Sequence, residues 1–525
     1  MKNVSKKWAF LLLLAVNHIH ARPRPKPRPK PKLTNTHMHS LVQTPPPIVT
    51  YDKTPIEIMK HNVLHTFVPI GNFVDDFVRG TFPTWENSTF EIFDTVKDPE
   101  GIAIDIGAWI GTTAIWLSKN FAHVVAAEPD VASLQCLRAN LEASGCPNVT
   151  ICERPVAQTS KEVVFGPRGD DLNGSMSYIK TESDKPVDYT VRAIPFKQLV
   201  HDYIYKNEQL ASRKITFIKC DVEGGEEEIL EDILHFAYYN NVKVYMSFHC
   251  DWWKSKKITD FADLFSYFKT ECPYGDPCTY IQNDPFGSIL FEPLNNGRLL
   301  LKENMPAIII GYQQVTYIRN MVKQLEKYTK DIIVIDNAST FQPLLDYYKH
   351  EFTYTLLRQP INYGHMVYYS DFIQQLVGDV FILTDPDLEF NKRLPDDFIK
   401  TLMDISIYFN AGRVGFALAI SANDLRRDVK VHGKIIKEWE QQFWQQRVYY
   451  SPDRSLRLFR AAIDTTFCLI NKRCSSTKQI RIAGDFTCDH LPWHKSYKES
   501  LLPGEDEAYK ENNKISTWWR TRLKK

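Results

Sequence analysis

The sequence predicts an α/β fold in which two successive units each build a mostly parallel β-sheet. Short apolar runs alternate with helical segments over residues 101–293, which is typical of a doubly wound sheet. A short polar joint at 294–304 interrupts this pattern, and the same alternation starts again at Pro306. A chain of 525 residues is long enough for two domains of this kind.

The composition is that of an ordinary globular protein, with 43% hydrophobic residues, 24% charged residues and a net charge of +1. The basic excess is confined to the N-terminal arm, so we expect no nucleic-acid partner. The 10 cysteines form no C-x-x-C pair and no zinc-binding spacing. Cys272 and Cys278 bracket a turn and could close a disulfide in an oxidising compartment, although free thiols are an equally good interpretation.

Residues 1–50 are predicted to be a leader and a linker outside both units. Lysines followed by WAFLLLLAV resemble a secretory signal peptide, and this apolar run is too short for a conventional transmembrane span. The arm at 22–32, RPRPKPRPKPK, alternates cations with prolines and predicts an extended spacer. The leader suggests the secretory pathway. A cytoplasmic location stays open because the glycosylation sequons at Asn173 and Asn337 lie inside motifs described below.

The first unit, assigned to residues 51–297, contains an amphipathic segment at 88–96 that suits either a helix or a strand. Apolar runs after this segment predict strands, and helical segments separate them. The predicted strands are IAIDIG (102–107), HVVAAEP (123–129), VTICER (149–154), VVFGP (163–167), YTVRAIPF (189–196), ITFIKCDV (215–222), VKVYMSF (242–248) and SILFEP (288–293). The predicted helices span 112–119, 131–144, 196–206 and 225–236.

A glycine loop joins the first of these strands to the first helix. Asp105 ends the strand, Gly107 and Gly111 form the turn, and the helix is expected from Thr112, which is a common cradle for nucleotide-like ligands. The spacing D-x-G-x-x-x-G differs from G-x-G-x-x-G, so it argues against a bound pyrophosphate and against a dinucleotide oxidoreductase. It suits S-adenosylmethionine, which carries no phosphate. Glu128 ends the next strand about 20 residues later, where a carboxylate can bind both ribose hydroxyls.

Two more polar residues, Asp221 and His249, also fall at the ends of predicted strands. The carboxyl ends of the strands in a doubly wound sheet line the ligand crevice. We therefore expect Asp105, Glu128, Asp221 and His249 to converge at one edge of the first sheet.

Residues 101–293 resemble a class I S-adenosylmethionine-dependent methyltransferase of the FkbM type, a Rossmann-like α/β fold. The motifs that match are DIGAWIGTTA, AAEPD, Asn140, NGSMS and FIKCDVEGGEEEIL. The resemblance implies O-methylation, commonly of a sugar or polyketide hydroxyl. In the glycine loop, Trp109 stands where the family usually has a small polar residue. The cofactor-binding residues that we predict are Asp105, Gly107, Gly111, Glu128 and Asn140.

The methyl carbon of a sulfonium is already electrophilic, so the protein must align an acceptor oxygen and help to remove its proton. We predict that Asp221, Glu223 and His249 are the catalytic residues on the acceptor side. For Glu223 and Glu226 the alternative is a charged helix N-terminus, which the helix dipole would favour. For His249 a core or capping histidine is an equally good interpretation.

The second unit, assigned to residues 303–525, repeats the alternation of strands and helices. Its predicted strands are PAIIIGY (306–312), DIIVIDNAST (331–340), YTLLRQP (354–360) and DVFILTDPDLEF (379–390). Its predicted helices span 314–329, 341–350 and 364–376. The polar tail at 495–525 is predicted either to pack a helix against this unit or to fray.

Carboxylates follow two strands of the second unit. Asp336 is placed to accept a hydrogen bond from the edge of a uracil or guanine base. Asp385 and Asp387 follow an apolar strand and can chelate a divalent ion that bridges a nucleotide diphosphate. Together with Asn337–Ser339 and Asn362–Gly364, they make this unit resemble a GT-A glycosyltransferase, similar to family 2. The resemblance implies a nucleotide-sugar donor with Mn²⁺ or Mg²⁺.

This second resemblance covers residues 305–494, and its later half would form the acceptor side. His494 or His490 would supply a third metal ligand, with His494 preferred. Asp464 is the predicted general base for the acceptor hydroxyl, and Glu440 is the reserve. For both carboxylates the alternative is an ordinary surface or capping role.

Together these observations predict a bifunctional glycan-modifying enzyme, an O-methyltransferase joined to a metal-dependent glycosyltransferase, with a saccharide or glycoconjugate acceptor. Two alternatives stay open. The chain could be a glycosyltransferase whose methyltransferase-like domain is degenerate and only binds the acceptor, which the unusual Trp109 would favour. It could also be a non-catalytic glycan-binding surface protein that is held in place by its basic arm.

Overall fold

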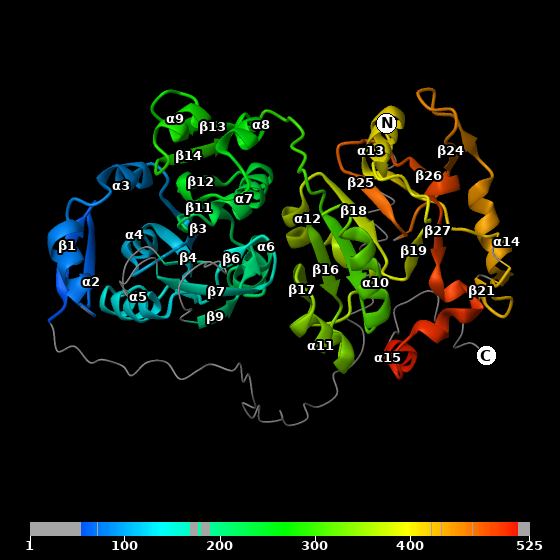
Figure 1. Cartoon of the computed structure of the whole chain (residues 1–525), viewed down its shortest axis with the longest axis horizontal. Coiled ribbons are helices and arrows are strands. Elements are labelled where there is room, and N and C mark those ends of the chain that lie inside the picture. The colour runs from blue at the N-terminus through cyan, green and yellow to red at the C-terminus, as the bar shows by residue number, and fades with distance from the viewer. Residues whose placement is uncertain are drawn as a thin grey trace, which may run out of the picture. The chain divides into compact units, whose positions relative to one another are not determined.

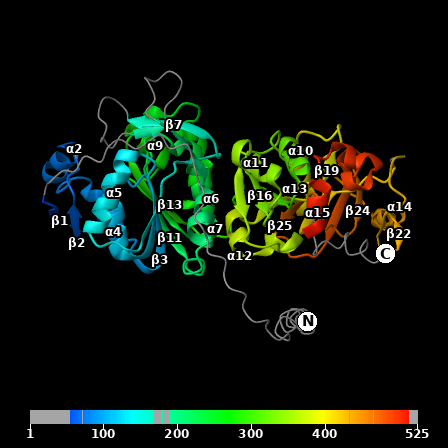
Figure 2. The same cartoon turned by 90° about the horizontal axis from the view of Figure 1, so that it is seen from below.

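The computed structural model describes residues 54–70, 72–167, 177–179, 189–421, 423–431, 433–464 and 466–512. All of them belong to one compact part of the chain, Val49–Lys525, which contains both α/β units. Two large sheets, each accompanied by helices, organise this part of the chain (Figures 1 and 2). The predicted leader, the basic arm, the sequon at Asn173 and the end of the tail from residue 513 lie outside the described residues.

The first sheet has 7 strands in the order β13-β14-β12-β11-β3-β4-β5. Their bounds are β3 (Asp98–Ile106), β4 (Phe121–Ala127), β5 (Val149–Cys152), β11 (Ile215–Cys220), β12 (Lys243–Ser247), β13 (Phe268–Glu271) and β14 (Ser288–Pro293). The strands from β12 to β5 in this order run parallel to one another. At the β12 edge, β14 pairs antiparallel with β12, and β13 pairs antiparallel with β14. After β3 the chain adds β4 and β5 on one side of this strand. It later adds β11 and then β12 on the other side. The topological switch point, where such sheets bind ligands, therefore lies between β3 and β11.

Helices cover both faces of this sheet, and the strand sequences explain how. Their bounds are α4 (Thr112–Asn120), α5 (Val131–Ala143), α6 (Phe196–Val200) and α7 (Glu226–Asn240). Successive side chains of a strand point to opposite faces. Ile104 of β3 shares a buried core with Ile229 of α7, whereas the neighbouring Ala103 shares a different core with Ile115 of α4. The continuous apolar run of β3 is thus explained by burial on both faces.

The segment before β3 adds to the core on the α4 face, because buried Phe67, Phe82 and Phe90 belong to the same cluster as Trp116. The remaining elements of the first unit are β1 (Ile56–Lys60), β2 (Val63–Phe67), α2 (Asn72–Asp76), α3 (Asn87–Asp94), β6 (Val156–Ala157), β7 (Glu162–Pro167), β8 (Ser177–Ile179), β9 (Tyr189–Arg192), β10 (Ile194–Pro195), α8 (Ala262–Phe265) and α9 (Pro277–Asn283).

The second sheet has 9 strands in the order β17-β16-β15-β18-β25-β20-β26-β24-β23. Its parallel half contains β15 (Ala307–Gly311), β16 (Ile332–Asp336), β17 (Thr355–Arg358) and β18 (Val380–Thr384). The other strands are β20 (Arg413–Phe416), β23 (Arg447–Val448), β24 (Arg457–Arg460), β25 (Cys468–Asn471) and β26 (Gln479–Ala483). Strand β25 runs antiparallel to both of its neighbours, β18 and β20, so the sheet is mixed.

The second sheet is accompanied by α10 (Val315–Leu325), α11 (Gln342–His350), α12 (Asp371–Val377), α13 (Phe398–Phe409), α14 (Ile436–Glu440) and α15 (Glu505–Asn512). Two short antiparallel pairs complete this unit, β19 (Leu388–Phe390) with β27 (Cys488–His490) and β21 (Lys430–Val431) with β22 (Lys434–Ile435). The pairing of β19 with β27 brings Cys488–His490 close to the Asp385–Asp387 segment.

Four predicted helices differ from the structure. The helix expected at 225–236 continues to Asn240. The helix expected at 364–376 is a 3₁₀ helix at Gly364–Tyr369 followed by α12, because Ser370, at the N-cap position of α12, has an extended backbone (ψ 139°) that interrupts the helix. The helix expected at 196–206 is α6 followed by a π-helical turn from His201 to Tyr205. The helix expected at 314–329 ends at Leu325. The ambiguous segment at 88–96 forms the helix α3.

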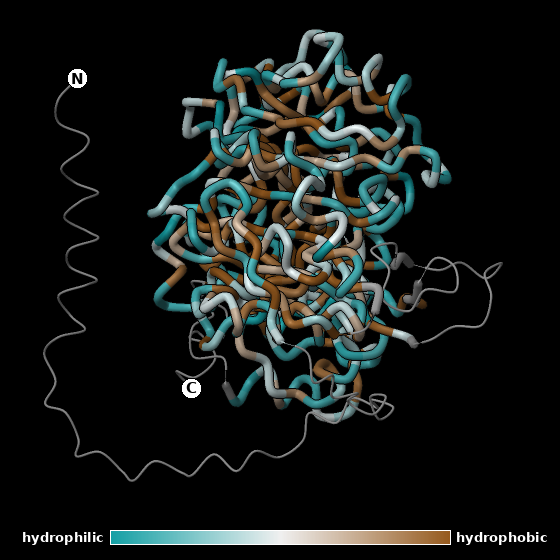
Figure 3. The backbone as a smooth tube through the Cα atoms, turned by 90° about the vertical axis from the view of Figure 1, so that its left-hand side faces the viewer, coloured by the Kyte–Doolittle hydropathy of each residue, from teal (hydrophilic) through white to brown (hydrophobic). Residues whose placement is uncertain are grey.

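Hydropathy separates the interior of both units from their periphery. The brown, apolar stretches of the chain run through the interior, and the teal, hydrophilic stretches form most of the outer loops (Figure 3). In the part of the chain that the structure describes, no helix is both long and apolar enough to span a bilayer.

Candidate functional sites

The glycine loop after β3 lies directly against the end of β11. A Cβ atom on Gly107, which has a φ of +84°, would stand 1.7 Å from the carbonyl oxygen of Asp221. Glycine is therefore required here both by the left-handed backbone and by the close approach of the two chains. The N–H groups of Gly107 and Ala108 donate to the carbonyl of Ala127, which fastens the loop to β4. The loop thus touches both neighbours of β3.

Asp105 lies fully buried at the end of β3 and is held by two neighbours. Its carboxylate accepts a hydrogen bond from Thr113 Oγ1 (2.7 Å), and Lys219 Nζ lies 3.2 Å from Asp105 Oδ1. Burial raises the pKa of Asp105, although Lys219 opposes this shift. Lys219 also donates to the carbonyl of Gly107 (2.7 Å) and lies 3.7 Å from Asp221 Oδ2. This lysine joins the loop, β3 and β11 at the switch point.

Glu128 lies at the end of β4 with its carboxylate turned toward the loop. It accepts hydrogen bonds from the backbone N–H groups of Trp109 (2.8 Å) and Asp130 (2.8 Å). Burial raises the pKa of Glu128 to about 8, even though both N–H groups favour its ionised form. These two bonds use only half of the acceptor capacity of a carboxylate, which has about four lone-pair sites.

Asn140 and Trp109 support the loop from behind. Buried Asn140 donates to the carbonyl of Ile110 (2.8 Å) and accepts from the N–H of Val68 (2.7 Å). Trp109 has a left-handed backbone (φ 48°), and its indole packs against Phe77 with ring centroids 4.7 Å apart. The side chain that departs from the family pattern is therefore accommodated in the aromatic core before β3.

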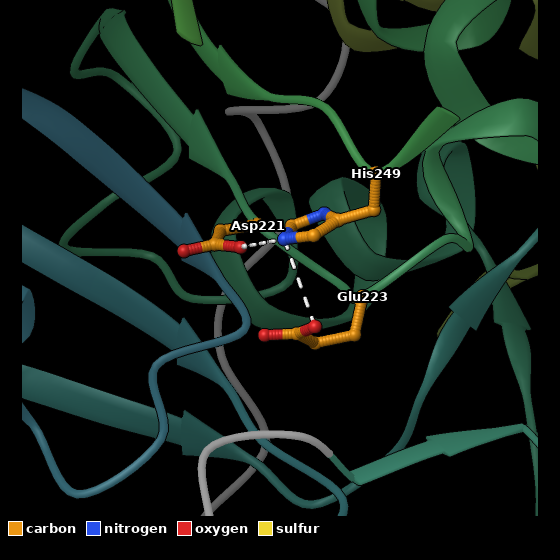
Figure 4. A group of neighbouring side chains, drawn as sticks. All are labelled: Asp221, Glu223 and His249. Carbon is orange, nitrogen blue, oxygen red and sulfur yellow. Dashed lines mark ion pairs between the residues drawn. The ribbon is translucent and has the colours of Figure 1, made fainter. Parts of the chain in front are cut away.

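Asp221, Glu223 and His249 form a cluster just beyond the ends of β11 and β12, and Figure 4 shows all three side chains turned toward one another. His249 Nε2 lies 3.8 Å from Asp221 Oδ1 and 3.6 Å from Glu223 Oε2. The imidazole ring also stacks on Trp252, with centroids 5.1 Å apart. The structure thus brings together the three residues that we predicted for the acceptor side.

The other nitrogen of His249 is fixed by a residue that sequence reasoning did not assign to the site. His249 Nδ1 lies 2.9 Å from Glu226 Oε1, and Glu226 is fully buried in the first turn of α7. The carboxylate of Glu226 also accepts from the N–H groups of Val222 and Gly224. Burial lowers the pKa of His249, but the hydrogen bond to Glu226 and the surrounding carboxylates outweigh it and raise the pKa to about 9.

Asp336 ends β16 in the second sheet and is fully buried. It accepts from the N–H of Ser339 (3.1 Å) and from Arg358 Nε (3.3 Å), and burial raises its pKa despite both partners. Asn337 links this strand end to the next loop, because it donates to the carbonyl of Gly364 (3.2 Å) and accepts from the N–H of Tyr363 (3.3 Å). The two motifs that supported the second resemblance are therefore in contact.

Asp385 and Asp387 follow β18, and the structure places His490 beside them. Leu388 of β19 pairs with His490 of β27, and His490 Nε2 lies 3.5 Å from Asp387 Oδ2. Asp387 Oδ1 is buried and has no hydrogen-bond partner among the described residues. His494, our preferred ligand from the sequence, instead has its Nδ1 2.9 Å from Asp424 Oδ1.

The two candidate bases of the second unit lie in different surroundings. Asp464 is exposed and lines a cavity of about 400 Å³ together with Tyr369 and Arg413. Glu440 is buried and forms an ion pair with Arg481. Burial raises the pKa of Glu440 to about 7, although Arg481 opposes the shift.

Lys219 and Glu226 are the site residues that sequence reasoning missed. Lys219 is a charged residue inside an apolar strand, which is a signal in itself because an isolated lysine is rarely buried without a carboxylate partner. Glu226 is the first of three consecutive glutamates, and from the sequence it was interpreted only as a charged residue at a helix N-terminus.

Two family models match separate stretches of the chain. Residues 105–274 match the methyltransferase FkbM domain, and residues 307–407 match glycosyl transferase family 2. Among curated proteins, no sequence matches the chain.

Several solved structures are similar to part of the chain. The methyltransferase FkbM of Methylobacillus flagellatus KT is 15% identical with a TM-score of 0.24, over 39% of this chain and 51% of that one. An rRNA methylase from Streptococcus thermophilus is 12% identical with a TM-score of 0.24, over 40% and 96% of the respective chains. TYW2 of M. jannaschii, solved in complex with AdoMet, is 10% identical with a TM-score of 0.23, over 47% and 90%.

The two family matches fall on the two α/β units in the order that the sequence predicted. The chain is therefore an enzyme in which a methyltransferase FkbM domain with a Rossmann-like α/β fold is followed by a glycosyl transferase family 2 domain.

Proposed function

We propose that this enzyme modifies glycans with two active sites. The first domain would methylate a sugar hydroxyl with S-adenosylmethionine, and the second would transfer a sugar from a nucleotide-sugar donor with Mn²⁺ or Mg²⁺. The observation that carries the proposal is a shared arrangement at the strand ends of each sheet. A buried carboxylate suited to a nucleoside, Glu128 or Asp336, lies at one strand end, and a group of acid and histidine side chains lies at another.

The residues around the glycine loop fit S-adenosylmethionine. The loop from Gly107 packs without side chains against β11, and the free lone pairs of Glu128 can accept from two ribose hydroxyls. Lys219 neutralises Asp105 behind the loop and keeps the cradle in place. When bound, the cofactor supplies an electrophilic methyl group. Asp221, Glu223 and His249 then face the acceptor hydroxyl and help to remove its proton.

In the second domain, Asp387 Oδ1 supports a cation site because a buried carboxylate oxygen without a partner is costly unless an ion or a ligand binds it. Asp385, Asp387 and His490 would hold the cation, which neutralises the diphosphate of the donor. Asp336 would bind the base of the nucleotide. Asp464 would act as general base, which its exposed position beside a cavity supports, whereas Glu440 is already paired with Arg481.

The test of the second activity is a panel of nucleotide-sugars incubated with the full chain and Mn²⁺. We expect hydrolysis or transfer from one UDP- or GDP-sugar, inhibited by a chelator and abolished in Asp387→Ala. Asp371→Ala, on α12, is the matched control and should retain the activity. Turnover that survives Asp387→Ala would contradict the assigned cation site, and no turnover with any donor would contradict the activity itself.

The test of the first activity is calorimetric titration with S-adenosylmethionine, followed by transfer of a labelled methyl group to an oligosaccharide panel. We expect binding that is weakened in Asp105→Ala, and label in at least one acceptor. Binding without transfer to any saccharide would instead favour a degenerate domain that only holds the acceptor. Absence of binding would overturn the assignment of the cofactor.

A further inference from the structure

Asp221, Glu223 and His249 have the geometry of a set of metal ligands. One ligand atom from each side chain lies within 4.8 Å of the other two. Nitrogen and oxygen ligands about 2.1 Å from a shared cation lie roughly 3.0–3.6 Å from one another. The distances from His249 Nε2 to the two carboxylates, 3.6 and 3.8 Å, are at or just above this range. They are also too long for direct hydrogen bonds.

Glu226 orients His249 as a metal-binding histidine is oriented. Such a histidine commonly donates its other ring N–H to a carboxylate, which fixes the tautomer and points the remaining nitrogen at the ion. Here His249 Nδ1 lies 2.9 Å from Glu226 Oε1, so Nε2 is the nitrogen that faces Asp221 and Glu223. Glu226 is outside the cluster and is itself fixed by two backbone N–H groups, which makes the arrangement rigid.

The balance of charge around the cluster also favours a bound cation. Four carboxylates surround the switch point, on Asp105, Asp221, Glu223 and Glu226. Lys219 compensates mainly Asp105, because its Nζ is closer to that carboxylate (3.2 Å) than to Asp221 (3.7 Å). The second positive charge is the proton on His249, whose pKa these carboxylates raise to about 9. A divalent cation bound at Nε2 would replace this proton and balance more of the carboxylate charge, since bound cations are often the largest local charges in such sites.

The cluster is open to a substrate. The side chains of His249, Glu223 and Asp221 remain 12%, 16% and 23% exposed, so an acceptor can reach the ligand atoms. The carbonyl of Asp221 touches the glycine loop at Gly107, which places the cluster next to the proposed cofactor cradle. Three protein ligands leave coordination positions free, as in catalytic rather than structural metal sites.

We propose that Asp221, Glu223 and His249 bind a divalent cation that holds and activates the acceptor hydroxyl for methyl transfer. This inference rests on the proposed methyltransferase function. The cation binds the hydroxyl oxygen and favours loss of its proton to water. The oxygen then forms a bond to the methyl carbon, the sulfur–carbon bond breaks, and its electron pair stays on sulfur as a neutral thioether. One proton is released for each methyl group transferred.

Two carboxylates with one imidazole suit Mn²⁺, so this ion is the probe. The full chain should be titrated with Mn²⁺ alone by electron paramagnetic resonance in an Asp387→Ala background, which removes the cation site proposed for the second domain. We expect one bound Mn²⁺ in this background, with a nitrogen coupling from His249 in the pulsed spectrum. Adding Glu223→Gln should weaken binding by at least tenfold, and adding His249→Gln should remove the nitrogen coupling.

Glu228→Gln is the matched control, because Glu228 lies on α7 and pairs with Lys161 away from the cluster. It should leave Mn²⁺ binding unchanged. No bound Mn²⁺ in the Asp387→Ala background, or binding that Glu223→Gln and His249→Gln both leave intact, would overturn the proposal. Circular dichroism of each variant excludes loss of fold. Methyl transfer at full rate in the presence of a chelator would contradict the role of the cation but leave the methyltransferase function standing. Mn²⁺ binding without any methyl transfer would contradict the methyltransferase function but leave the cation site standing.

Discussion

At the scale of single residues, Glu128 is the side chain on which cofactor recognition depends. Its carboxylate is buried and already accepts the N–H groups of Trp109 and Asp130, so its orientation is fixed before a ligand arrives. A preorganised acceptor loses little entropy on binding, which makes its hydrogen bonds to ribose hydroxyls effective.

We predict that at pH 9, where Glu128 with its pKa of about 8 is ionised, Glu128→Gln weakens the binding of S-adenosylmethionine by about 10- to 100-fold, because hydrogen bonds to a charged group contribute about 1.5–3 kcal/mol. The amide keeps the size of the side chain but turns one acceptor into a donor. Isothermal titration of the full chain measures the change. Glu142→Gln, an exposed position on α5, should bind like the wild type. Equal affinity for Glu128→Gln and Glu142→Gln would contradict the role of Glu128.

His490 and His494 are four positions apart, and only the tertiary structure separates them as metal ligands. Because His490 Nε2 lies 3.5 Å from Asp387 while His494 lies against Asp424, we predict that His490→Ala lowers the Mn²⁺ affinity of the second domain by about tenfold or more. His494→Ala should change it less than twofold. Donor hydrolysis as a function of Mn²⁺ concentration measures both. A larger loss of Mn²⁺ affinity in His494→Ala than in His490→Ala would favour His494 as the metal ligand, as the sequence suggested.

At the scale of elements, the first site is assembled where the loop after β3 meets the end of β11. Gly107 makes this junction possible, since a side chain there would collide with the backbone of Asp221. Gly145, after α5, has a similar left-handed backbone (φ +60°), but a Cβ there would meet nothing within 4 Å. The two glycines therefore separate the cost of the backbone conformation from the cost of the collision.

We predict that Gly145→Ala lowers the free energy of unfolding by about 1–2 kcal/mol, the cost of a left-handed conformation alone. Gly107→Ala should lower it by at least about 3 kcal/mol, because the collision is with backbone and cannot be relieved by a side-chain rotation. Urea denaturation measures both changes. A similar loss in the two variants would show that the loop can move away from β11.

The elements show which parts of the fold were predictable. The strand-loop-helix around Asp105 was predictable, because the apolar run, the two glycines and the helical segment that follows them are local signals. The break at Ser370 was not predicted, because the extended backbone at this residue lies inside a stretch that was predicted as one continuous helix. The proximity of His490 to Asp387 was not predictable. It comes from the pairing of β19 with β27, two strands that are about 100 residues apart in the chain. Lys219 stayed unrecognised because Asp105, the carboxylate nearest to its Nζ, comes from another strand.

At the scale of the whole molecule, the two domains are joined by a buried ion network around Asp331, the residue before β16. Asp331 accepts from Lys197, on α6 of the first domain, and from Lys302 of the connecting segment (2.8 Å). Lys302 also pairs with Asp232 on α7. The three members Lys197, Lys302 and Asp331 are each less than 10% exposed. The network therefore couples the stability of one domain to that of the other.

Burial raises the pKa of Asp331, but the charges of Lys197 and Lys302 outweigh it and hold the pKa far below its usual range. A carboxyl whose pKa is lower in the folded state stabilises the protein above the unfolded pKa of about 3.9, and this stability is lost as the pH falls below it.

We predict that Asp331→Asn lowers the free energy of unfolding at pH 7 by about 3–5 kcal/mol, because two buried lysines lose a shared partner. The loss of stability from pH 5 to pH 3 should be smaller in the variant than in the wild type. Urea denaturation at these pH values measures both effects, with the exposed Asp346→Asn on α11 as the control. An unchanged pH dependence in Asp331→Asn would show that other carboxyls set the acid stability.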